Sequence, residues 1–206
     1  MEDEQIKIFD ENRRSIGVAT RKEVHASGYW HEVFQCWFVC REHENDYIYF
    51  QLRSDSKKDY PCLYDITAAG HLLENETVED GVREIEEELG VKVSFEELLP
   101  VTVMNASIEK ENMIDKEIAN VFLYRNDKTF NDFQLQLEEV SGIVRAEFNS
   151  FYNLWTGETE AIRVHGFRML SAGEKKAVDE TIRKHHFVPH EPSFYETVAK
   201  KIKEML

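Results

Sequence analysis

Short stretches of alternating or continuous apolar residues fill the first three quarters of the chain, and stretches of this length are typical of β-strands. An N-terminal hairpin is predicted at residues 5–20, where IKIFD and IGVAT flank the turn-like ENRRS. Two longer strands, VFQCWFVC and YIYFQLR, flank the polar turn REHEND. Further strands are predicted at VKVSF (91–95), NVFLY (120–124) and IVRAEF (143–148).

Helical periodicity, with apolar residues three and four positions apart, occurs in four segments. These are Thr77–Leu89, Ser150–Trp155, Gly173–His185 and Phe194 to the last residue. Because strands and helices interleave, we expect an α/β or α+β fold built in layers. Neither a repeat nor a linker-like segment divides the sequence, so one domain is predicted at 1–206, with its core at about 30–160. The last two helices would form a C-terminal helical extension at 172–206.

The charge of the chain restricts its partners. It has 40 acidic and 25 basic residues, which give a formal net charge of −15. Such a charge disfavours nucleic acids and anionic membranes and favours cations, so we expect neither nucleic acid nor membrane as a partner. No apolar run reaches the ~18 residues that span a bilayer, and the acidic start MEDEQIK is unlike a signal peptide, so a cytoplasmic location is expected. The sequence leaves both a monomer and a homodimer open.

The predicted helix that ends at Leu89 has an unusual distribution of charge. Thr77-x-x-Asp80 predicts its start and Gly90 its end. Its apolar residues fall on one stripe that can dock on a sheet: Val78, Val82, Ile85 and Leu89. Its carboxylates at spacing i, i+3, i+4 fall away from this stripe: Glu84, Glu87 and Glu88.

These carboxylates lower the stability of the helix that carries them. Like charges four residues apart cost roughly 0.2–0.5 kcal/mol, and Glu in a last turn opposes the helix dipole by a further ~0.3–1 kcal/mol. A solvated acidic face is the simplest interpretation of such a run. A helix that carries both of these costs, however, indicates a bound cation that offsets them. Three oxygen ligands suit Mg²⁺ or Mn²⁺.

The stretch from Gly70 to Val91 resembles the Nudix box, G-x5-E-x7-R-E-U-x-E-E-x-G-U, where U is aliphatic. Every named residue is present, but six residues instead of seven separate Glu76 from Arg83. The resemblance implies a Nudix-type α/β/α sandwich with a mixed sheet. It also implies roles for five residues: metal binding by Glu84, Glu87, Glu88 and Gly70, and catalysis by Glu87 with Arg83 orienting a glutamate.

A wider resemblance, over roughly residues 5–155, is to the Nudix branch related to isopentenyl-diphosphate isomerase. It is carried by Gly28-x-Trp30-His31, Gln51-x-Arg53, Lys57 and Ala68-Ala69-Gly70-His71, among others. It implies that Arg53 and Lys57 bind a diphosphate, and two cations just after an apolar strand independently suit a phosphate.

Four more residues are candidates for the site. Glu117, at the start of a predicted strand, matches a position where Nudix proteins often place a metal ligand or a catalytic base. His25, His31 and His71 loosely match histidines that bind metal in the isomerases, and capping or hydrogen bonding in the core is the alternative.

The resemblance predicts a metal-dependent Nudix hydrolase that cleaves a small-molecule diphosphate linked to another moiety, by attack of water on phosphorus. Two alternatives are a non-catalytic diphosphate sensor with the same fold and an isopentenyl-diphosphate isomerase. The sensor would be expected to lack one of the helix carboxylates. The isomerase is disfavoured because Ala69 stands where the isomerases have a catalytic cysteine, and a methyl group cannot transfer a proton.

Overall fold

The computed structural model describes residues 3–110, 113–170 and 173–206. Residue 1, where the predicted domain begins, and residue 172, where the predicted extension begins, lie outside the described residues. The described strands are β1 (Gln5–Phe9), β2 (Ser15–Thr20), β3 (Trp30–Glu42), β4 (Asn45–Arg53), β5 (Tyr64–Asp65), β6 (Ala68–His71), β7 (Leu98–Lys110), β8 (Met113–Arg125), β9 (Val140–Glu147), β10 (Ile162–Met169) and β11 (Lys175–Ile182). The described helices are α1 (Arg21–Ser27), α2 (Arg83–Leu89), α3 (Phe148–Thr156) and α4 (Pro192–Lys203), with short 3₁₀ turns at Asp80–Val82, Phe95–Glu97 and Lys184–His186.

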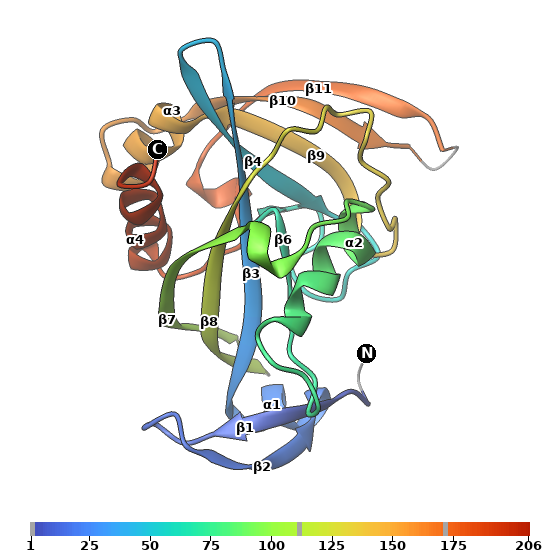
Figure 1. Cartoon of the computed structure of the whole chain (residues 1–206), viewed down its shortest axis with the longest axis vertical. Helices are drawn as coiled ribbons and strands as arrows, with labels where there is room; N and C mark the ends of the chain where they lie inside the picture. Colours follow the sequence, from blue (N-terminus) through green and yellow to red (C-terminus); the bar gives the residue numbers. More distant parts are fainter. Residues whose placement is uncertain (1–2, 111–112, 171–172) are drawn as a thin grey trace.

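One mixed sheet contains all of the described strands, and β3 runs through its middle (Figure 1). β3 pairs antiparallel with β4 and β6 and parallel with β8. From β4 the sheet continues through β9 and β10 to β11, and on its other side β3 meets the β1–β2 hairpin. A strand with neighbours on both edges and helices over both faces has no polar face, which explains the nearly continuous apolar run in β3.

Helices cover both faces of the sheet, and the alternation of side chains along β3 separates two cores. Trp37 packs with Phe151 of α3 and Tyr195 of α4. Phe38, which points to the opposite face, belongs to the cluster that includes Ile85 of α2. Figure 1 shows α2 on one side of the sheet and α3 and α4 on the other. The predicted α/β/α sandwich with a mixed sheet is therefore confirmed.

The predicted N-terminal hairpin is confirmed as β1 and β2, and it leads into a helix that the sequence pattern did not predict. At the start of α1, the Thr20 hydroxyl accepts a hydrogen bond from the Glu23 amide at 3.3 Å, and the Glu23 carboxylate accepts one from the Thr20 amide at 2.9 Å. α1 ends at Gly28, whose φ of 68° favours glycine. Arg21 and His25 of this short helix line the cavity that is described below.

The predicted helix at Thr77–Leu89 forms, but its first part is a tighter turn. Asp80–Val82 is a 3₁₀ turn and α2 starts only at Arg83. A Cβ atom on Gly81 would lie 2.6 Å from the Cβ of Phe34, so this glycine lets the turn approach β3 closely. Gly90 ends the helix with a φ of 68°, as predicted.

The predicted helix at Gly173–His185 is wrong, because this segment contains the strand β11. β11 pairs with β10 through eight residue pairs. Most of its side chains are exposed, so its polar pattern gives little sign of a strand, and pairing with a neighbour decides the structure. The extension is therefore a strand, a 3₁₀ turn and α4, and of the two predicted C-terminal helices only the last is confirmed.

The predicted strand at 91–95 is also wrong. Val91 and Val93 pack into the same core as α2, but they belong to no strand. The chain leaves α2 beside the segment before β9, where the Gln134 amide donates to the carbonyl of Leu89 at 2.9 Å. The alternating valines therefore reflect burial in the core beneath α2, and not a β-strand. Among the described helices, none is long and apolar enough to cross a membrane.

Candidate active site

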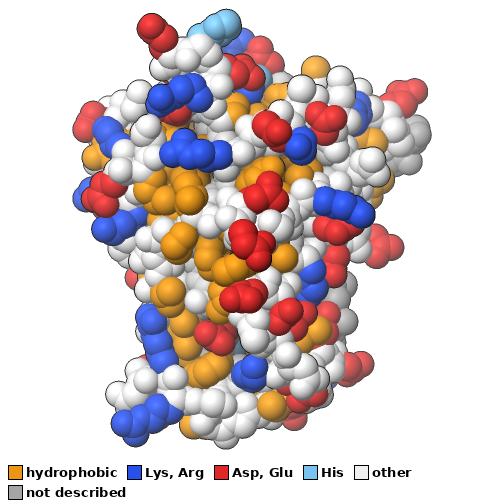
Figure 2. All heavy atoms as spheres, viewed as in Figure 1, with side chains coloured by type: hydrophobic (Ala, Val, Ile, Leu, Met, Phe, Trp, Pro, Cys, Tyr) orange, Lys and Arg blue, Asp and Glu red, His pale blue; other side chains and the backbone are white. Residues whose placement is uncertain are grey.

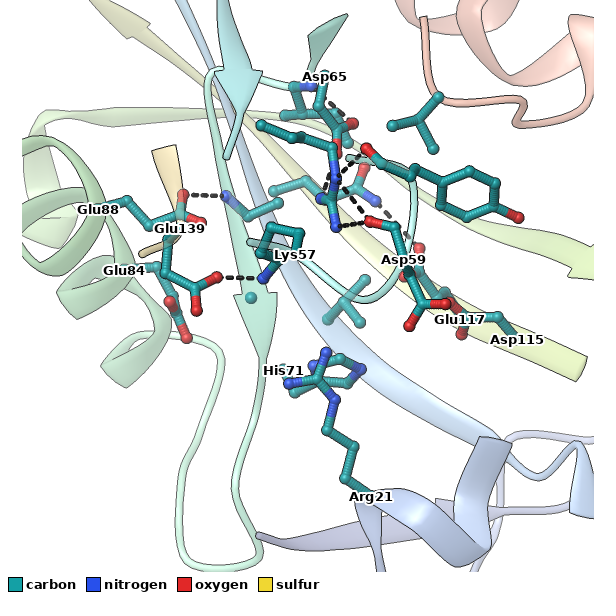
Figure 3. A pocket seen from close by; sticks show the side chains of 18 of the residues that line it. Arg21, Lys57, Asp59, Asp65, His71, Glu84, Glu88, Asp115, Glu117 and Glu139 are labelled. Carbon is teal, nitrogen blue, oxygen red and sulfur yellow. Dashed lines mark hydrogen bonds and ion pairs between the residues drawn. The ribbon is translucent and has the colours of Figure 1, made fainter. Parts of the chain in front are cut away.

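A cavity of about 640 Å³ lies beside α2 and β6 (Figure 3). Its volume suits a small-molecule ligand, since ligand pockets are typically about 300–1,000 Å³. Side chains of α1, β3, β4, β6, α2 and β8 line it, together with the loop after β4 and the loop before α4. Its described lining holds eleven carboxylates and four basic side chains, so the cavity is strongly acidic.

Arg83 connects the carboxylates of α2. Its guanidinium donates to Glu76 at 2.5 and 2.9 Å, to Glu84 at 2.6 Å and to Glu87 at 3.0 Å. It also donates to the carbonyl of His71 at 3.1 Å, which ties α2 to β6. Arg83 therefore contacts three carboxylates, and the shortened spacing after Glu76 still allows the Glu76–Arg83 pair to form. Its role in orienting a glutamate during catalysis stays a prediction.

Glu84 points from α2 toward Gly70 on β6. A Cβ on residue 70 would lie 2.1 Å from the Glu84 carboxyl carbon, so only glycine leaves room for this side chain. The Glu84 side chain is 13% exposed. Burial raises its pKa to about 7, although the charge of Arg83 acts in the opposite direction. Gly70 thus makes space for a carboxylate, and metal binding by Gly70 itself stays a prediction.

Glu88 lies deeper than Glu84 and is 7% exposed. Its carboxylate accepts hydrogen bonds from the Gln51 side chain at 3.2 Å and from the Ala69 amide at 3.1 Å. Burial raises the pKa of Glu88 well above its usual range, and the nearby charge of Glu84 adds to this effect. Figure 3 shows Glu84, Glu88 and Glu139 together on one wall of the cavity.

Glu87 lies at the rim of the cavity, and its side chain is 53% exposed. It lines the same cavity as Glu84 and Glu88, so the structure brings all three predicted carboxylates to one site. They do not form one of the compact groups of described residues whose ligand atoms all lie within 4.8 Å of one another. Arg83 holds Glu84 and Glu87, while Gln51 holds Glu88.

The two predicted phosphate-binding residues reach the cavity with different partners. Lys57 forms an ion pair with Glu139, a residue to which sequence analysis gave no role. Arg53 donates to Asp65 at 2.8 Å and to the carbonyl of Asp59 at 2.8 Å. Arg53 therefore also anchors the loop after β4, whereas Lys57 lies between the opposite walls of the cavity (Figure 3).

The three candidate histidines meet beside the cavity, which His25 and His71 line, although they come from α1, β3 and β6. Their ring centroids are 5.0–5.3 Å apart, and the Nε2 atoms of His25 and His71 lie 3.3 Å apart. His31 is fully buried, and burial lowers its pKa to about 4. Burial also lowers the pKa values of His25 and His71, so all three rings are neutral at neutral pH and keep a lone pair for a metal ion.

Two carboxylates of β8 complete this histidine cluster. Asp115 Oδ1 lies 3.6 Å from His25 Nε2 and 3.4 Å from His31 Nε2. Neither His31 Nε2 nor Asp115 Oδ1 has a hydrogen-bond partner among the described residues, although both atoms are buried. Glu117, which pairs with His31 across β3 and β8, accepts from Gln35 at 3.2 Å, and burial raises its pKa well above its usual range. Figure 3 places Asp115 and Glu117 on the wall opposite Glu84 and Glu88.

Some lining residues had no recognised signal in the sequence. Asp115 and Glu139 line the cavity, but neither was a candidate in the sequence analysis. His190 comes from the loop before α4, and its ring stacks on Phe194 with centroids 4.4 Å apart. The period-2 alternation of β8 would have placed Asp115 on the same face as Glu117, but His190 depends on long-range packing that no local pattern reports.

Comparison with known proteins identifies the family to which the chain belongs. The chain is 34% identical over 202 residues to an uncharacterised Nudix hydrolase of Clostridium acetobutylicum, covering 98% of each chain. It is 26% identical over 156 residues to an isopentenyl-diphosphate Delta-isomerase of Salmonella paratyphi B, covering 74% of this chain and 82% of the other. The crystal structure of a MutT/nudix family protein from Enterococcus faecalis superposes with a TM-score of 0.52 at 12% identity, covering 84% and 62% of the two chains. No family model matches the chain.

The fold and site define an α+β enzyme with a carboxylate-lined cavity beside a short helix. The chain belongs to the Nudix hydrolase family.

Proposed function

We propose that the protein hydrolyses small molecules in which a diphosphate is linked to another moiety, by attack of water on phosphorus and with Mg²⁺ or Mn²⁺ as cofactor. One observation carries the proposal: half-buried Glu84 and buried Glu88 face the same cavity as Lys57. Carboxylate oxygens suit hard divalent cations, and a divalent cation together with a lysine suits a diphosphate.

The donors on α2 fit a divalent cation. Burial raises the pKa values of Glu84 and Glu88, and a nearby cation would stabilise their ionised forms. Glu84, Glu87 and Glu88 would hold the ion, with Glu139 on the same wall. When bound, it would offset phosphate charge and lower the pKa of a bound water.

The other residues of the site would bind, orient and accept a proton. Arg83 would keep Glu84 and Glu87 in place during the reaction. Lys57 would exchange its partner Glu139 for a phosphate oxygen. Either Glu87 or Glu117 would take the proton from the attacking water, and Glu87 has the side chain that is open to solvent at the rim.

The histidine cluster supports a second cation site. His25, His31, His71, Asp115 and Glu117 offer three imidazoles and two carboxylates, and two of their buried polar atoms have no hydrogen-bond partner among the described residues. Mixed nitrogen and oxygen donors favour a transition metal such as Mn²⁺ or Zn²⁺. We propose that these residues bind such an ion in preference to the core hydrogen bonding that the sequence also allowed.

A substrate screen tests the proposed function. The purified protein would be incubated with nucleoside di- and triphosphates, nucleotide sugars and isopentenyl diphosphate, each with Mg²⁺, with Mn²⁺ and with a chelator. We expect metal-dependent release of phosphate or of a phosphate monoester from at least one diphosphate. Tight binding of a diphosphate with no turnover under any metal condition would favour the sensor and contradict hydrolysis.

Replacing Lys57 with alanine is expected to raise KM about tenfold or more with a smaller change in kcat, because a phosphate contact common to substrate and transition state is lost. Steady-state kinetics on the substrate found in the screen measures both constants. Lys200→Ala, on the exposed face of α4, is the matched control and should change neither. A large fall in kcat with KM unchanged would contradict the binding role.

Arg53→Ala should raise KM as well, but it should also lower the melting temperature because Arg53 anchors a loop.

Isopentenyl diphosphate should not be converted to dimethylallyl diphosphate. Two of the three cysteines are poorly placed for this reaction, since Cys36 is buried under α2 and Cys62 is exposed. No cysteine is among the described residues that line the cavity, and Ala69 has no group that transfers a proton. Chromatography of the products after incubation with metal distinguishes released phosphate from the isomer. Formation of the isomer at enzyme-like rates would overturn this prediction.

A further inference from the structure

The strand β11 ends the sheet on one side, and its outer edge is unpaired. The described strands run in the order β11-β10-β9-β4-β3-β1-β2, so β11 pairs with β10 and with no other described strand. Figure 1 shows β11 as the last strand at this border of the sheet. The backbone amides and carbonyls of such an edge can pair with a strand of another chain.

The hairpin between β10 and β11 determines which residues of β11 face outward. The Leu170 amide donates to the Glu174 carbonyl at 2.9 Å, so these two residues form a hydrogen-bonded pair. Hydrogen-bonded and non-hydrogen-bonded pairs alternate along an antiparallel ladder. The residues of β11 whose amide and carbonyl groups point away from β10 are therefore Lys175, Ala177, Asp179 and Thr181.

The charges of β11 are divided between its two halves. Lys175 and Lys176 lie in the first half, Asp179 and Glu180 lie in the second, and all four are exposed. Lys175 and Asp179 already have partners in their own chain. Lys176 has no hydrogen bond or ion pair with a described residue, and Glu180 accepts from the Tyr64 hydroxyl through Oε1, which leaves Oε2 open. Antiparallel pairing of two identical strands about a twofold axis sets the first half of each against the second half of the other.

One register of such a pair brings opposite charges together. Outward-facing residues must meet outward-facing residues, so the axis passes beside Val178 or beside Ala177 if most of the strand is to stay paired. With the axis at Val178, Lys176 of each copy lies opposite Glu180 of the other in a non-hydrogen-bonded pair, where side chains are closest. The two Val178 side chains then face each other. With the axis at Ala177, Glu174 would lie opposite Glu180 and repel it.

Elsewhere, charge disfavours contact between two copies. The chain has a net charge of −15, and acidic side chains are spread over the face shown in Figure 2. A large net charge keeps proteins apart. The edge strand at the other end of the sheet, β2, is flanked by Arg14 and Arg21, so antiparallel pairing of two β2 strands would bring cations together. β11, by contrast, lets two copies attract each other.

We propose that β11 pairs antiparallel with β11 of a second copy of this chain, about a twofold axis at Val178, and so forms a homodimer with one continuous sheet. Two ion pairs between Lys176 and Glu180, together with backbone hydrogen bonds of the outward-facing residues, hold the copies together. No residue of β11 is among the described residues that line the candidate active site, so the inference does not depend on the proposed hydrolysis.

Charge reversal at these two positions tests the pairing. Sedimentation velocity over a micromolar concentration series at physiological ionic strength measures the dissociation constant of the dimer. We expect the wild type to dimerise, and we expect Lys176→Glu and Glu180→Lys each to raise the dissociation constant about tenfold or more, because each sets like charges opposite each other. The double variant Lys176→Glu/Glu180→Lys restores opposite charges and the wild-type net charge, so it should restore the dimer. An equimolar mixture of the two single variants should form a heterodimer.

Three comparisons separate this pairing from a general effect of charge. Glu180→Lys makes the chain less acidic, so a non-specific contact between copies would tighten where the proposed one weakens. Lys200→Glu, on the exposed face of α4, is the matched control and should leave the dissociation constant unchanged. Ala177→Pro removes an outward-facing amide that the ladder with β10 does not use, so it should weaken the dimer without a charge change. A wild type that stays monomeric throughout the series, or a dimer that neither single reversal weakens, would overturn the inference.

Discussion

Glu88→Gln is expected to lower kcat by a factor of about 100 or more, and Glu87→Gln to do the same, because each removes an oxygen ligand of the proposed cation. Neither change should lower the melting temperature. Glu88 is buried with a raised pKa, so its charge costs stability, and glutamine keeps an oxygen that can accept from the Ala69 amide. Kinetics on the substrate found in the screen, together with thermal unfolding, measures both effects.

The matched control is Glu86→Gln. Glu86 belongs to the same run on α2, but its side chain is 55% exposed and lies 3.3 Å from Lys92, away from the cavity lining. This variant loses the same charge and should keep turnover within about twofold. Near-wild-type activity of both Glu87→Gln and Glu88→Gln would show that the metal assignment on α2 is wrong.

His31→Asn is expected to remove one equivalent of tightly bound metal from the protein. His31 is fully buried between His25, His71 and Asp115, so its loss takes a central ligand from the histidine cluster. The metal content of the protein, loaded with Mn²⁺ or Zn²⁺ and then desalted, gives the stoichiometry directly. This readout does not depend on activity.

Two further variants test whether the loss of metal in His31→Asn is specific to the histidine cluster. Asp115→Asn removes a proposed ligand that comes from β8 and should also lower the amount of metal bound per protein. The same result in both variants would show that the loss of metal is not a folding defect specific to His31→Asn. His186 lies in the 3₁₀ turn before α4, outside the cavity lining, so His186→Asn should leave the metal stoichiometry unchanged. Equal metal content in the wild type, His31→Asn and Asp115→Asn would assign the cluster to core hydrogen bonding.

The parts of the site that lie within one local segment could be predicted from the sequence. Glu84, Glu87 and Glu88 sit on one short helix, so their spacing alone predicts that they share a face, and Gly90 marks where that helix ends. The burial of Glu84 against Gly70 could not be predicted in this way, because β6 reaches α2 only through the pairing of β6 with β3.

The contacts that depend on pairing between distant strands could not be predicted from local sequence patterns. His31 and Glu117 become neighbours because β3 and β8 run parallel in one register, 86 positions apart in the chain. β11 became visible as a strand only through its ladder with β10. Glu139 lies in the segment before β9, and its role emerges only from its ion pair with Lys57. Local propensity carries no information on these contacts.

Hydrolysis in water enriched in oxygen-18 tests the central claim most directly. The substrate found in the screen would be turned over by the wild type with Mg²⁺ or Mn²⁺, and mass spectrometry would locate the label in the products. Attack of water on phosphorus beside α2 predicts one labelled oxygen in a phosphate group of one product and none in a hydroxyl group of the released moiety. It also predicts no reaction with chelator and a rate about 100-fold or more lower in Glu88→Gln. Label on a carbon-bound oxygen, or the same labelled product at the same rate in Glu88→Gln, would contradict the account.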